Sequence, residues 1–472
     1  MSAVVSPPSP PPGSAPGPAP DPGLRDPWQR HRIAPGFRQE ALERGLLLRS
    51  CTSGPDPIGA HTALLAGAMG IGEQVAISED RALRASEGSR LQALMPSTSL
   101  TIVTPGLGRA LMEAYGPHPG SYLLARLPRP AGRPPWGSLR AGQRVRFHAV
   151  SPRGVYAGSS PTRIHRSLRR DARLGDPEQR PGAEGVLLSA LLLSDLIASL
   201  GAWSDPMLGE PMPRSPTFEA IPTVLPRPDH DLPSGLSVLI VGGGGALAHA
   251  FLEALAVDPL LRTCLAGGRL ALVDPDAFST SNLSRQTLAG GPHRLGMPKA
   301  ATTAMSLRAM PGMHAVEISG VDAAFNEAQI ERFRPDVVCL FADNWAARAQ
   351  AWRAVRARLG TLVLQAGTSF SFGAVRAVLV GGGRCLDCGP EGLARAAEQE
   401  AREQAARNSC SEEITPSNVL SNALAGALAA VALKRWAAGW GVDSRETFVN
   451  WSLPARIAWG RPNPPCACWR SP

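Results

Sequence analysis

The chain has 472 residues, of which 44% are hydrophobic and 18% are charged, so it is long enough for two or three globular domains. Its formal charge of +9 comes from dispersed arginines rather than from basic blocks, and we therefore expect no nucleic-acid partner. Eight cysteines are too few for a disulfide scaffold, and the N-terminus does not resemble a signal peptide, so we expect a cytoplasmic protein. No uninterrupted run of about 20 apolar residues occurs, which argues against a membrane protein.

Composition divides the chain into four segments. Residues 1–36 are rich in Pro, Ser, Ala and Gly and predict a disordered tail. Residues 37–201 predict a separate N-terminal α+β domain of unknown role. Residues 202–236 are again proline-rich and predict a linker, which leaves 237–472 as the second domain.

Strands alternate with helical stretches after residue 236. The expected strands are 237–241, 269–273, 337–341 and 361–366. This alternation is typical of βαβ units, so we predict an α/β fold with a doubly wound, Rossmann-like, mostly parallel sheet.

A run of four glycines follows the first of these strands. Gly242 and Gly244 match the first two positions of the G-x-G-x-x-G pattern, and a register shifted by one residue also includes Gly245. Such a turn lets a phosphate approach the backbone and the start of the next helix. Asp274 ends the second strand, where an acid can bind ribose hydroxyls. These features fit NAD, FAD or ATP equally well.

Three further motifs separate these possibilities. Asn282-Leu-Ser-Arg285-Gln286 forms a box after the second strand, Gly296-Met-Pro-Lys299 follows it, and Asp343-Asn344 comes after a later strand. In this order the motifs resemble the ThiF/MoeB/HesA family, the bacterial relatives of ubiquitin-activating enzymes. Lys299 is one of only two lysines in an arginine-dominated chain, which points to a requirement for lysine there.

The resemblance implies an ATP-dependent adenylyltransferase. It implies that Arg285 and Lys299 act on the phosphates, that Asp343 binds Mg²⁺, and that Asp274 binds the ribose. The further nucleotide-binding residues expected from it are Gly242, Gly244, Gly245, Asn282, Gln286 and Asn344. Because the carboxylate and the α-phosphate are both anions, such a catalyst works mainly by positioning and by neutralising charge.

The cysteines predict a second kind of site. Cys385 and Cys388 form one closely spaced pair, and Cys466 and Cys468 form another near the end of the chain. Four thiolates in two pairs suit a tetrahedral structural Zn²⁺.

Cys410 lies in a predicted crossover loop at about 389–415, just before an apolar helix. Some members of the family carry a cysteine here that forms a thioester or persulfide. A helix N-terminus favours the thiolate, so we include Cys410 among the candidate catalytic residues.

The substrate expected from the resemblance is the C-terminal carboxylate of a small ubiquitin-like or sulfur-carrier protein. Expected partners are that protein, a conjugating enzyme and a second copy of the chain in a homodimer. A peptide substrate, a nucleotide-dependent oxidoreductase and a non-catalytic scaffold remain as alternatives. An arginine that the family supplies upstream of the first strand is absent here, and residues 163–173 are candidates to replace it.

Overall fold

The computed structural model describes residues 232–382, 385–388, 392–406, 417–439, 441, 446–450, 457–459, 466 and 468 of the C-terminal part. In the N-terminal part it describes 28–50, 57–77, 89–93, 99–103, 121–125, 147–158 and 182–199, with gaps of one or two residues inside some of these ranges. All structural statements below concern these residues.

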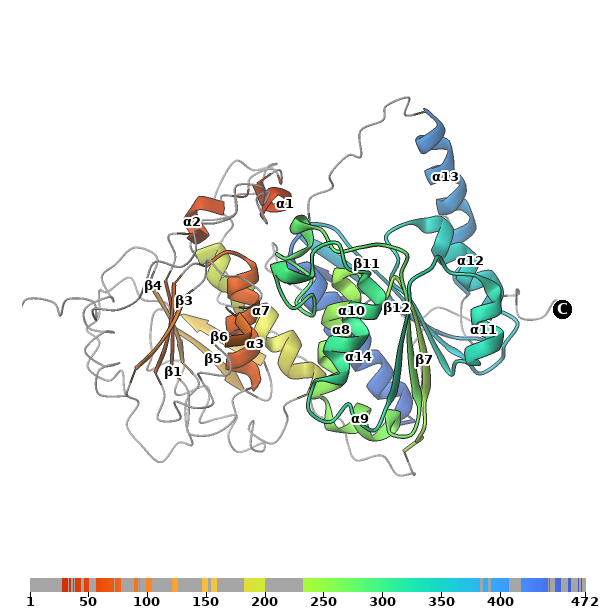
Figure 1. Cartoon of the computed structure of the whole chain (residues 1–472), viewed down its shortest axis with the longest axis horizontal. Helices are drawn as coiled ribbons and strands as arrows, with labels where there is room; N and C mark the ends of the chain where they lie inside the picture. The colour runs from red at the N-terminus through yellow and green to blue at the C-terminus, as the bar shows by residue number, and fades with distance from the viewer. Residues whose placement is uncertain are drawn as a thin grey trace, which may run out of the picture.

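An eight-stranded sheet forms the centre of the C-terminal part (Figure 1). Its strand order is β14-β13-β12-β11-β10-β7-β8-β9. Strands β9, β8, β7, β10 and β11 are parallel, and β12, β13 and β14 each continue the sheet by antiparallel pairing with the preceding strand. The strands are β7 (Ser237–Val241), β8 (Arg269–Val273), β9 (Glu317–Val321), β10 (Val337–Leu340), β11 (Leu362–Thr368), β12 (Phe372–Leu379), β13 (Glu446–Asn450) and β14 (Ile457–Trp459). The predicted doubly wound α/β fold is confirmed, and the four expected strands are β7, β8, β10 and β11.

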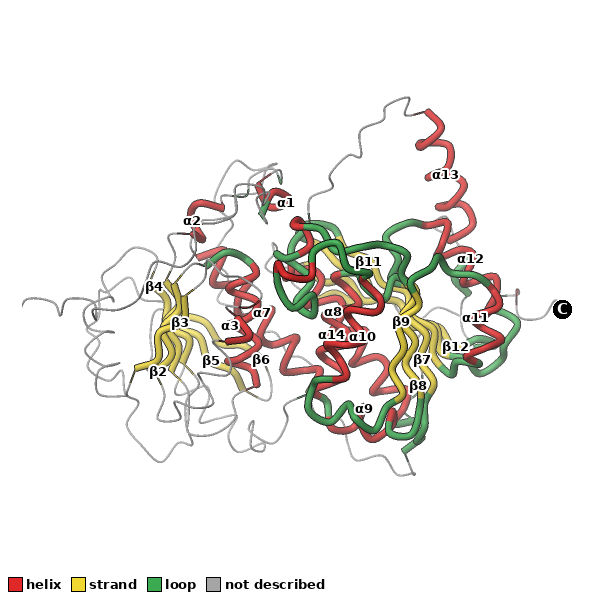
Figure 2. The backbone as a smooth tube through the Cα atoms, in the orientation of Figure 1, coloured by secondary structure: helices red, strands yellow, loops and turns green. Residues whose placement is uncertain are grey.

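Helices cover both faces of this sheet (Figure 2). One face packs against α8 (Ala246–Val257), α9 (Pro259–Leu265), α10 (Lys299–Arg308) and α14 (Val419–Ala437). The other packs against α11 (Glu327–Phe333) and α12 (Trp345–Val355), and α13 (Leu393–Ala406) lies on α12. In β7, Val238 and Ile240 face the first layer whereas Leu239 and Val241 face the second, which explains why the strand is apolar from Val238 onward.

Helix α13 lies within the segment predicted as a crossover loop at about 389–415. Residues 393–406 are helical because they consist largely of the strong helix formers Ala, Glu, Gln and Arg. An ion pair between Glu398 and Arg402, 3.8 Å apart and one turn apart, adds to this preference.

The N-terminal part has its own six-stranded sheet, in the order β3-β2-β1-β4-β5-β6. Five strands are parallel and β6 is antiparallel to β5. The strands are β1 (Leu46–Ser50), β2 (Glu73–Ile77), β3 (Ser99–Val103), β4 (Ser121–Ala125), β5 (Phe147–Ser151) and β6 (Gly154–Gly158), and the helices are α1 (Gln29–Arg32), α2 (Gln39–Glu43), α3 (Pro57–Ala68) and α7 (Ala183–Ser199).

The two parts share a hydrophobic core. Helices α3 and α7 contribute to the same cluster of buried side chains as α8 and α14, and α7 packs along α14. The boundary between the parts is therefore a buried helical layer. None of the described helices is both long and apolar enough to cross a membrane.

Candidate active site

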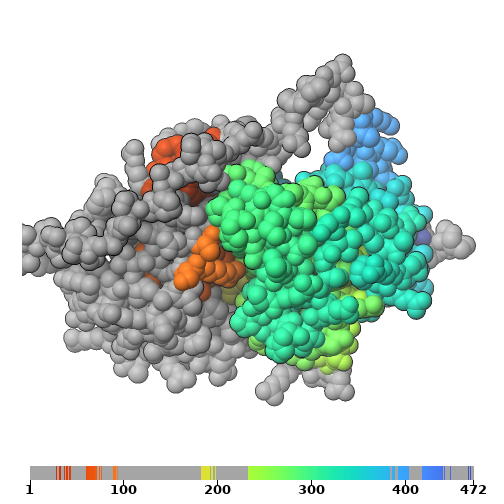
Figure 3. Space-filling model, viewed as in Figure 1, coloured from red at the N-terminus to blue at the C-terminus, as the bar shows by residue number. Residues whose placement is uncertain are grey.

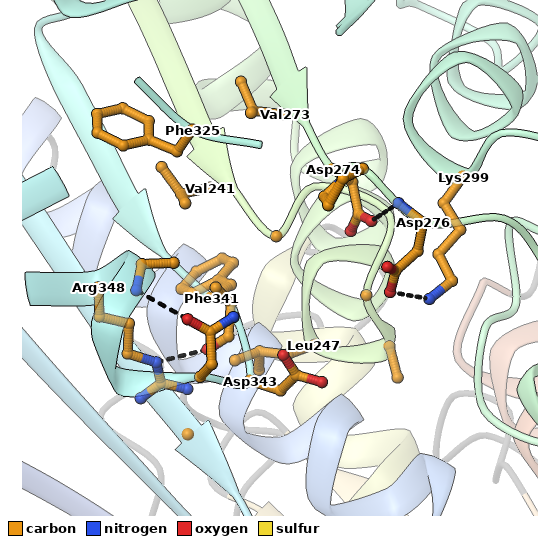
Figure 4. Close-up of a pocket in the computed structure, with 18 of the residues that line it drawn as sticks. Val241, Leu247, Val273, Asp274, Asp276, Lys299, Phe325, Phe341, Asp343 and Arg348 are labelled. Atoms are coloured by element: carbon orange, nitrogen blue, oxygen red, sulfur yellow. Dashed lines mark hydrogen bonds and ion pairs between the residues drawn. The ribbon is translucent and has the colours of Figure 1, made fainter. Parts of the chain in front are cut away.

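A cavity of ≈ 720 Å³ opens where the parallel strands of the C-terminal sheet end (Figure 4). The carboxyl ends of β7, β8, β10 and β11 all reach it. Because β8 and β10 lie on opposite sides of β7, this is the point where the strand order reverses, the usual ligand site of such sheets. The predicted residues that line it are Gly242, Gly245, Asp274, Arg285, Gln286, Lys299, Asp343 and Asn344. Gly244 and Asn282 lie behind its lining.

Close packing on two sides of the turn requires glycine at two of its positions. Gly242 has φ +84°, and a Cβ atom there would lie 2.5 Å from the backbone nitrogen of Ala342. A Cβ atom on Gly244 would lie 2.2 Å from the Cβ atom of Lys299. The turn thus brings the start of α8 to the cavity, and because no side chain caps that start, its N–H groups can receive an anion.

Asp274 is already bound to the backbone around it. Its two carboxylate oxygens accept hydrogen bonds from the N–H groups of Gly244 and Asp276, each at 3.0 Å. Burial raises the pKa of this carboxyl above its ordinary value, and the two hydrogen bonds oppose that effect. Asp274 therefore holds the glycine turn against β8 as well as lining the cavity.

Asp276 was missed by the sequence analysis. Its exposed carboxylate lies 2.8 Å from the Lys299 Nζ atom at the edge of the cavity. The lysine side chain is only 12% exposed, so this ion pair fixes where its ammonium group sits before any ligand binds. The missed signal was the second acid of the Asp-Pro-Asp sequence.

The residues of the Asn282–Gln286 box have two roles. Arg285 and Gln286 line the cavity, whereas Asn282 stabilises the turn beside it. Arg285 lines the cavity and donates a hydrogen bond to the carbonyl of Ser281 at 3.0 Å. Gln286 is 2% exposed, and its Oε1 atom has no hydrogen-bond partner among the described residues. Asn282 instead closes the turn, since its Oδ1 atom accepts the Ser279 N–H at 2.9 Å. A buried acceptor without a partner beside the cavity is what a ligand hydroxyl could satisfy.

The sequence alone indicates no partner for His249, but its buried ring stabilises the segment that follows this box. The Leu288 N–H donates to its Nδ1 atom at 3.0 Å, so its Nε2 atom carries the proton and donates to the Thr303 hydroxyl at 2.9 Å. Both ring nitrogens are thus used by the neutral imidazole. Burial lowers the pKa of His249 to about 3.

This histidine should make the protein sensitive to acid. Between pH 6.5 and 3 the unfolded chain binds a proton at His249 and the folded chain does not, so stability is lost as the pH falls through that window. The free energy of unfolding should drop by up to about 1.4 kcal/mol per pH unit from this group. Urea unfolding at a series of pH values should show a shallower slope for His249→Gln than for the wild type, and equal slopes would contradict the assignment.

Asp343 and Asn344 follow β10 and start α12. Asn344 caps that helix by accepting the Ala347 N–H at 2.8 Å, whereas the Asp343 carboxylate is exposed and has no hydrogen-bond partner among the described residues. Glu400 of α13 accepts hydrogen bonds from the N–H groups of Trp345 and Ala346 at 2.9 and 3.3 Å. These contacts fix α13 beside the cavity.

Arg348, one turn into α12, also lines the cavity (Figure 4). It is 6% exposed, donates from Nε to the Ala342 carbonyl at 2.5 Å, and stacks 4.9 Å from the Trp345 ring centroid. Its two terminal nitrogens bond to none of the described residues. Burial lowers the pKa of Arg348 to about 10, although the nearby carboxylates Asp343 and Glu400 oppose this shift. A largely unpaired guanidinium in this position can hold a carboxylate.

The four paired cysteines lie close together, on the face of the sheet that packs against α11 and α12. The sulfur atoms of Cys385, Cys388, Cys466 and Cys468 all lie within 4.8 Å of one another, and two of the separations are 3.3 Å. A tetrahedral Zn²⁺ with bonds of about 2.3 Å needs sulfur atoms roughly 3.8 Å apart. The cluster therefore fits zinc, and the single residue between the last two cysteines does not prevent both from reaching it.

Two predictions lie outside the described residues. Cys410 is one, and the arginine candidates of 163–173 are the other. Cys264 and Cys339 are fully buried in the core, as their apolar surroundings predict.

The model of the ThiF family matches residues 231–467, half of the chain, so the chain belongs to that family. The cavity at the reversal of strand order lies within the matched residues. No curated protein matches the chain.

Solved structures of Escherichia coli MccB resemble the chain more distantly. MccB with AMPCPP and MccA is 16% identical with a TM-score of 0.38 and covers 49% of this chain. MccB with ATP is 15% identical with a TM-score of 0.37 and covers the same share. The chain spans 65% and 66% of the length of these two proteins.

Proposed function

We propose that this protein uses ATP to adenylate the C-terminal carboxylate of a small ubiquitin-like or sulfur-carrier protein. The observation that carries the proposal is the cavity at the reversal of strand order, which is lined by Arg285, Lys299 and Asp343 together. Two cations and one free carboxylate around a glycine turn suit a triphosphate with its metal ion. Membership of the ThiF family supports the same chemistry.

The proposed reaction is a substitution at the α-phosphorus of ATP. An oxygen of the substrate carboxylate forms a bond to that phosphorus, the bond to the bridging oxygen of the β-phosphate breaks, and pyrophosphate leaves with the electron pair. The start of α8, Arg285 and Lys299 bind the phosphate oxygens, and Lys299 leaves Asp276 to do so. Neutralising the charge of the two reacting anions lowers the repulsion between them.

Asp343 would hold Mg²⁺ in this reaction. Its exposed carboxylate has no competing hydrogen bond among the described residues, and a hard cation prefers such an oxygen ligand. When bound, the ion adds positive charge next to the phosphates.

Arg348 is proposed to receive the substrate carboxylate. Its guanidinium is buried next to Gly367 and Asp343, at the end of the cavity opposite Lys299 and Asp276 (Figure 4). Arg348→Lys should raise the KM for the carrier protein by about tenfold and change the KM for ATP little, because one charge-assisted contact is weakened. Steady-state kinetics with each substrate varied in turn measures the two values. A rise in the KM for ATP alone would place the residue at the nucleotide instead.

An oxidoreductase would leave Lys299, Arg285 and Asp343 without a function, and a scaffold would not need their arrangement. The test uses a small protein that is encoded beside this chain and ends in Gly-Gly, with an otherwise identical carrier whose C-terminus is amidated. Pyrophosphate release should depend on ATP and on the free carboxylate. Equal rates with both carriers would contradict the proposal, whereas activity with a short peptide alone would indicate the peptide-modifying alternative.

The cysteine cluster is proposed to hold one structural zinc per chain. Around it, Arg376 donates to the Cys385 carbonyl at 2.7 Å, and the Trp352 indole donates to Asp387 at 2.7 Å. Zinc would therefore fasten the end of the chain to β12 and α12.

Cys385→Ser should release this zinc and lower the Tm, because a structural zinc site contributes directly to folding stability. Metal analysis of protein purified without chelators, together with thermal unfolding, measures both effects. Cys264→Ser, which changes a core cysteine, should keep the metal. Wild-type protein without zinc would refute the site.

The later steps of the reaction are proposed from the family resemblance. The Cys410 thiolate would attack the carbonyl carbon of the acyl-adenylate, forming a thioester with the carrier while AMP leaves, and a conjugating enzyme would be one possible next acceptor. The cytoplasmic location stays a prediction.

A further inference from the structure

The two sheets of this chain have the same topology. Numbered by order along the chain, the six strands of the N-terminal sheet and the first six of the eight strands of the C-terminal sheet run third, second, first, fourth, fifth, sixth across the sheet. In each the first five are parallel and the sixth is antiparallel to the fifth, as β6 is to β5 and β12 is to β11. Six strands placed alike in order and direction are a strong match, because many arrangements are possible.

The helices correspond as well. α3 follows β1 as α8 follows β7, and α7 comes after β6 as α14 comes after β12. Both first helices contain the sequence Ala-His-x-x-Leu, which places His61 and His249 at equivalent buried positions.

The corresponding helices also pack as equivalent partners. α3 packs on α7 in the N-terminal part, α8 packs on α14 in the C-terminal part, and α7 and α14 meet between them (Figure 1). A contact made by the same element from both sides is the pattern of a two-fold symmetric dimer interface.

We infer that residues 46–199 are a diverged second copy of the ThiF fold that occupies the place of a partner subunit and has lost its own nucleotide site. The chain is then an internal dimer with one active site. On this inference the chain contains its own partner, which replaces the homodimer expected from the sequence. Only the expected number of nucleotides bound per chain rests on the proposed function.

The loss of the second nucleotide site can be read from the residues at equivalent positions. Both lysines of the chain lie in the C-terminal copy, so the N-terminal copy has no counterpart of Lys299. One glycine, Gly54, stands between β1 and α3 where four stand between β7 and α8. Ser78 replaces Asp274 directly after the second strand, and Pro128 stands where Asp343 follows the fourth. The run of glycines, the lysine, and the acids equivalent to Asp274 and Asp343 are thus absent from the N-terminal copy.

The N-terminal copy instead supports the active site of the other. Leu64 of α3 forms a small core with Phe278, Leu283 and Ala289, which belong to the segment around the Arg285 box. Figure 3 shows an orange segment of the N-terminal part lying directly against the green C-terminal part.

Buried charges join the two copies near this contact. Glu253 of α8 is 2% exposed and pairs with Arg90 and, at 3.5 Å, with His61. At the other end of the interface Lys434 binds both carboxylate oxygens of Glu184 at 3.0 Å and an oxygen of Asp258 at 2.9 Å. Such pairs are costly to separate, so the copies should not come apart in solution.

The first test is the mass of the full chain by light scattering, combined with calorimetric titration of a non-hydrolysable ATP analogue. We expect a monomer of 49.6 kDa that binds one nucleotide. A stable dimer, or two nucleotides per chain, would overturn the inference. Failure to bind nucleotide at all would count against the proposed function, while the mass would still decide whether the partner is internal.

The second test compares neighbouring leucines of α3. Leu64 contacts the box segment, whereas Leu65, equally buried, belongs to the central helical core. Leu64→Ala should weaken ATP binding about tenfold more than Leu65→Ala does, because displaced phosphate ligands bind poorly. Equal effects of the two variants would overturn the supporting role, and Leu64→Val gives a milder comparison that preserves the fold.

Discussion

Replacing Asp343 with alanine should lower ATP–pyrophosphate exchange by about 10²-fold or more. The carboxylate is exposed at the end of β10, lines the cavity, and has no hydrogen bond to any described residue. Removing it therefore breaks no hydrogen bond to a described residue, and Glu400 remains as a carboxylate near Arg348. The exchange rate and the Tm of the variant should be measured together, with the Tm unchanged.

Asp343→Asn is the matched control for this experiment, because it keeps the shape of the side chain and removes the charge. It should be as inactive as the alanine variant. Near-normal exchange in either variant would rule out the metal-binding role of Asp343.

Lys299→Ala should cause a loss of similar size, about 10²-fold, through weaker binding of the phosphates. The ammonium group is held 2.8 Å from Asp276 at the edge of the cavity, and the lysine Cβ lies against Gly244. Lys299→Arg should also be impaired, since the larger planar guanidinium does not replace a compact ammonium at so crowded a position. Both the KM for ATP and the exchange rate should be measured.

Asp276→Asn serves as the comparison for Lys299. It removes the ion pair that holds the lysine before ATP binds but leaves the lysine itself, so exchange should stay within a few-fold of the wild type. Full activity of Lys299→Arg would show that any cation suffices, and full activity of Lys299→Ala would contradict a phosphate-binding role.

Four adjacent strands of the central sheet, β8, β7, β10 and β11, were predictable because most of their residues are buried. β7 and β8 are short runs of apolar residues that end at a glycine and an acid, and no other element suits that pattern. The gathering of Lys299, Arg285 and Asp343 was also predictable, since each belongs to a motif that follows a parallel strand, and such strands end at one edge.

Other features depend on contacts that no local pattern encodes. His249 reads as one more residue of an apolar helix until Leu288 and Thr303 are placed around it. Arg348 accompanies the Asp343-Asn344 motif in the sequence, but its burial becomes evident only when its helix packs against the sheet. The topology of the N-terminal part was missed because no glycine run marks the end of its first strand as one does for β7, and the pairing of its strands joins segments far apart in the chain.

The most direct test of adenylation is exchange of labelled pyrophosphate into ATP by the wild-type chain. We expect label to enter ATP only when Mg²⁺ and the carrier protein with a free C-terminal carboxylate are present, because exchange requires reversible formation of the acyl-adenylate. We predict that the wild type loses exchange when the carrier is omitted, and that Asp343→Asn shows no exchange even when the carrier is present. No exchange with the cognate carrier, or exchange that persists with the amidated carrier, would contradict it.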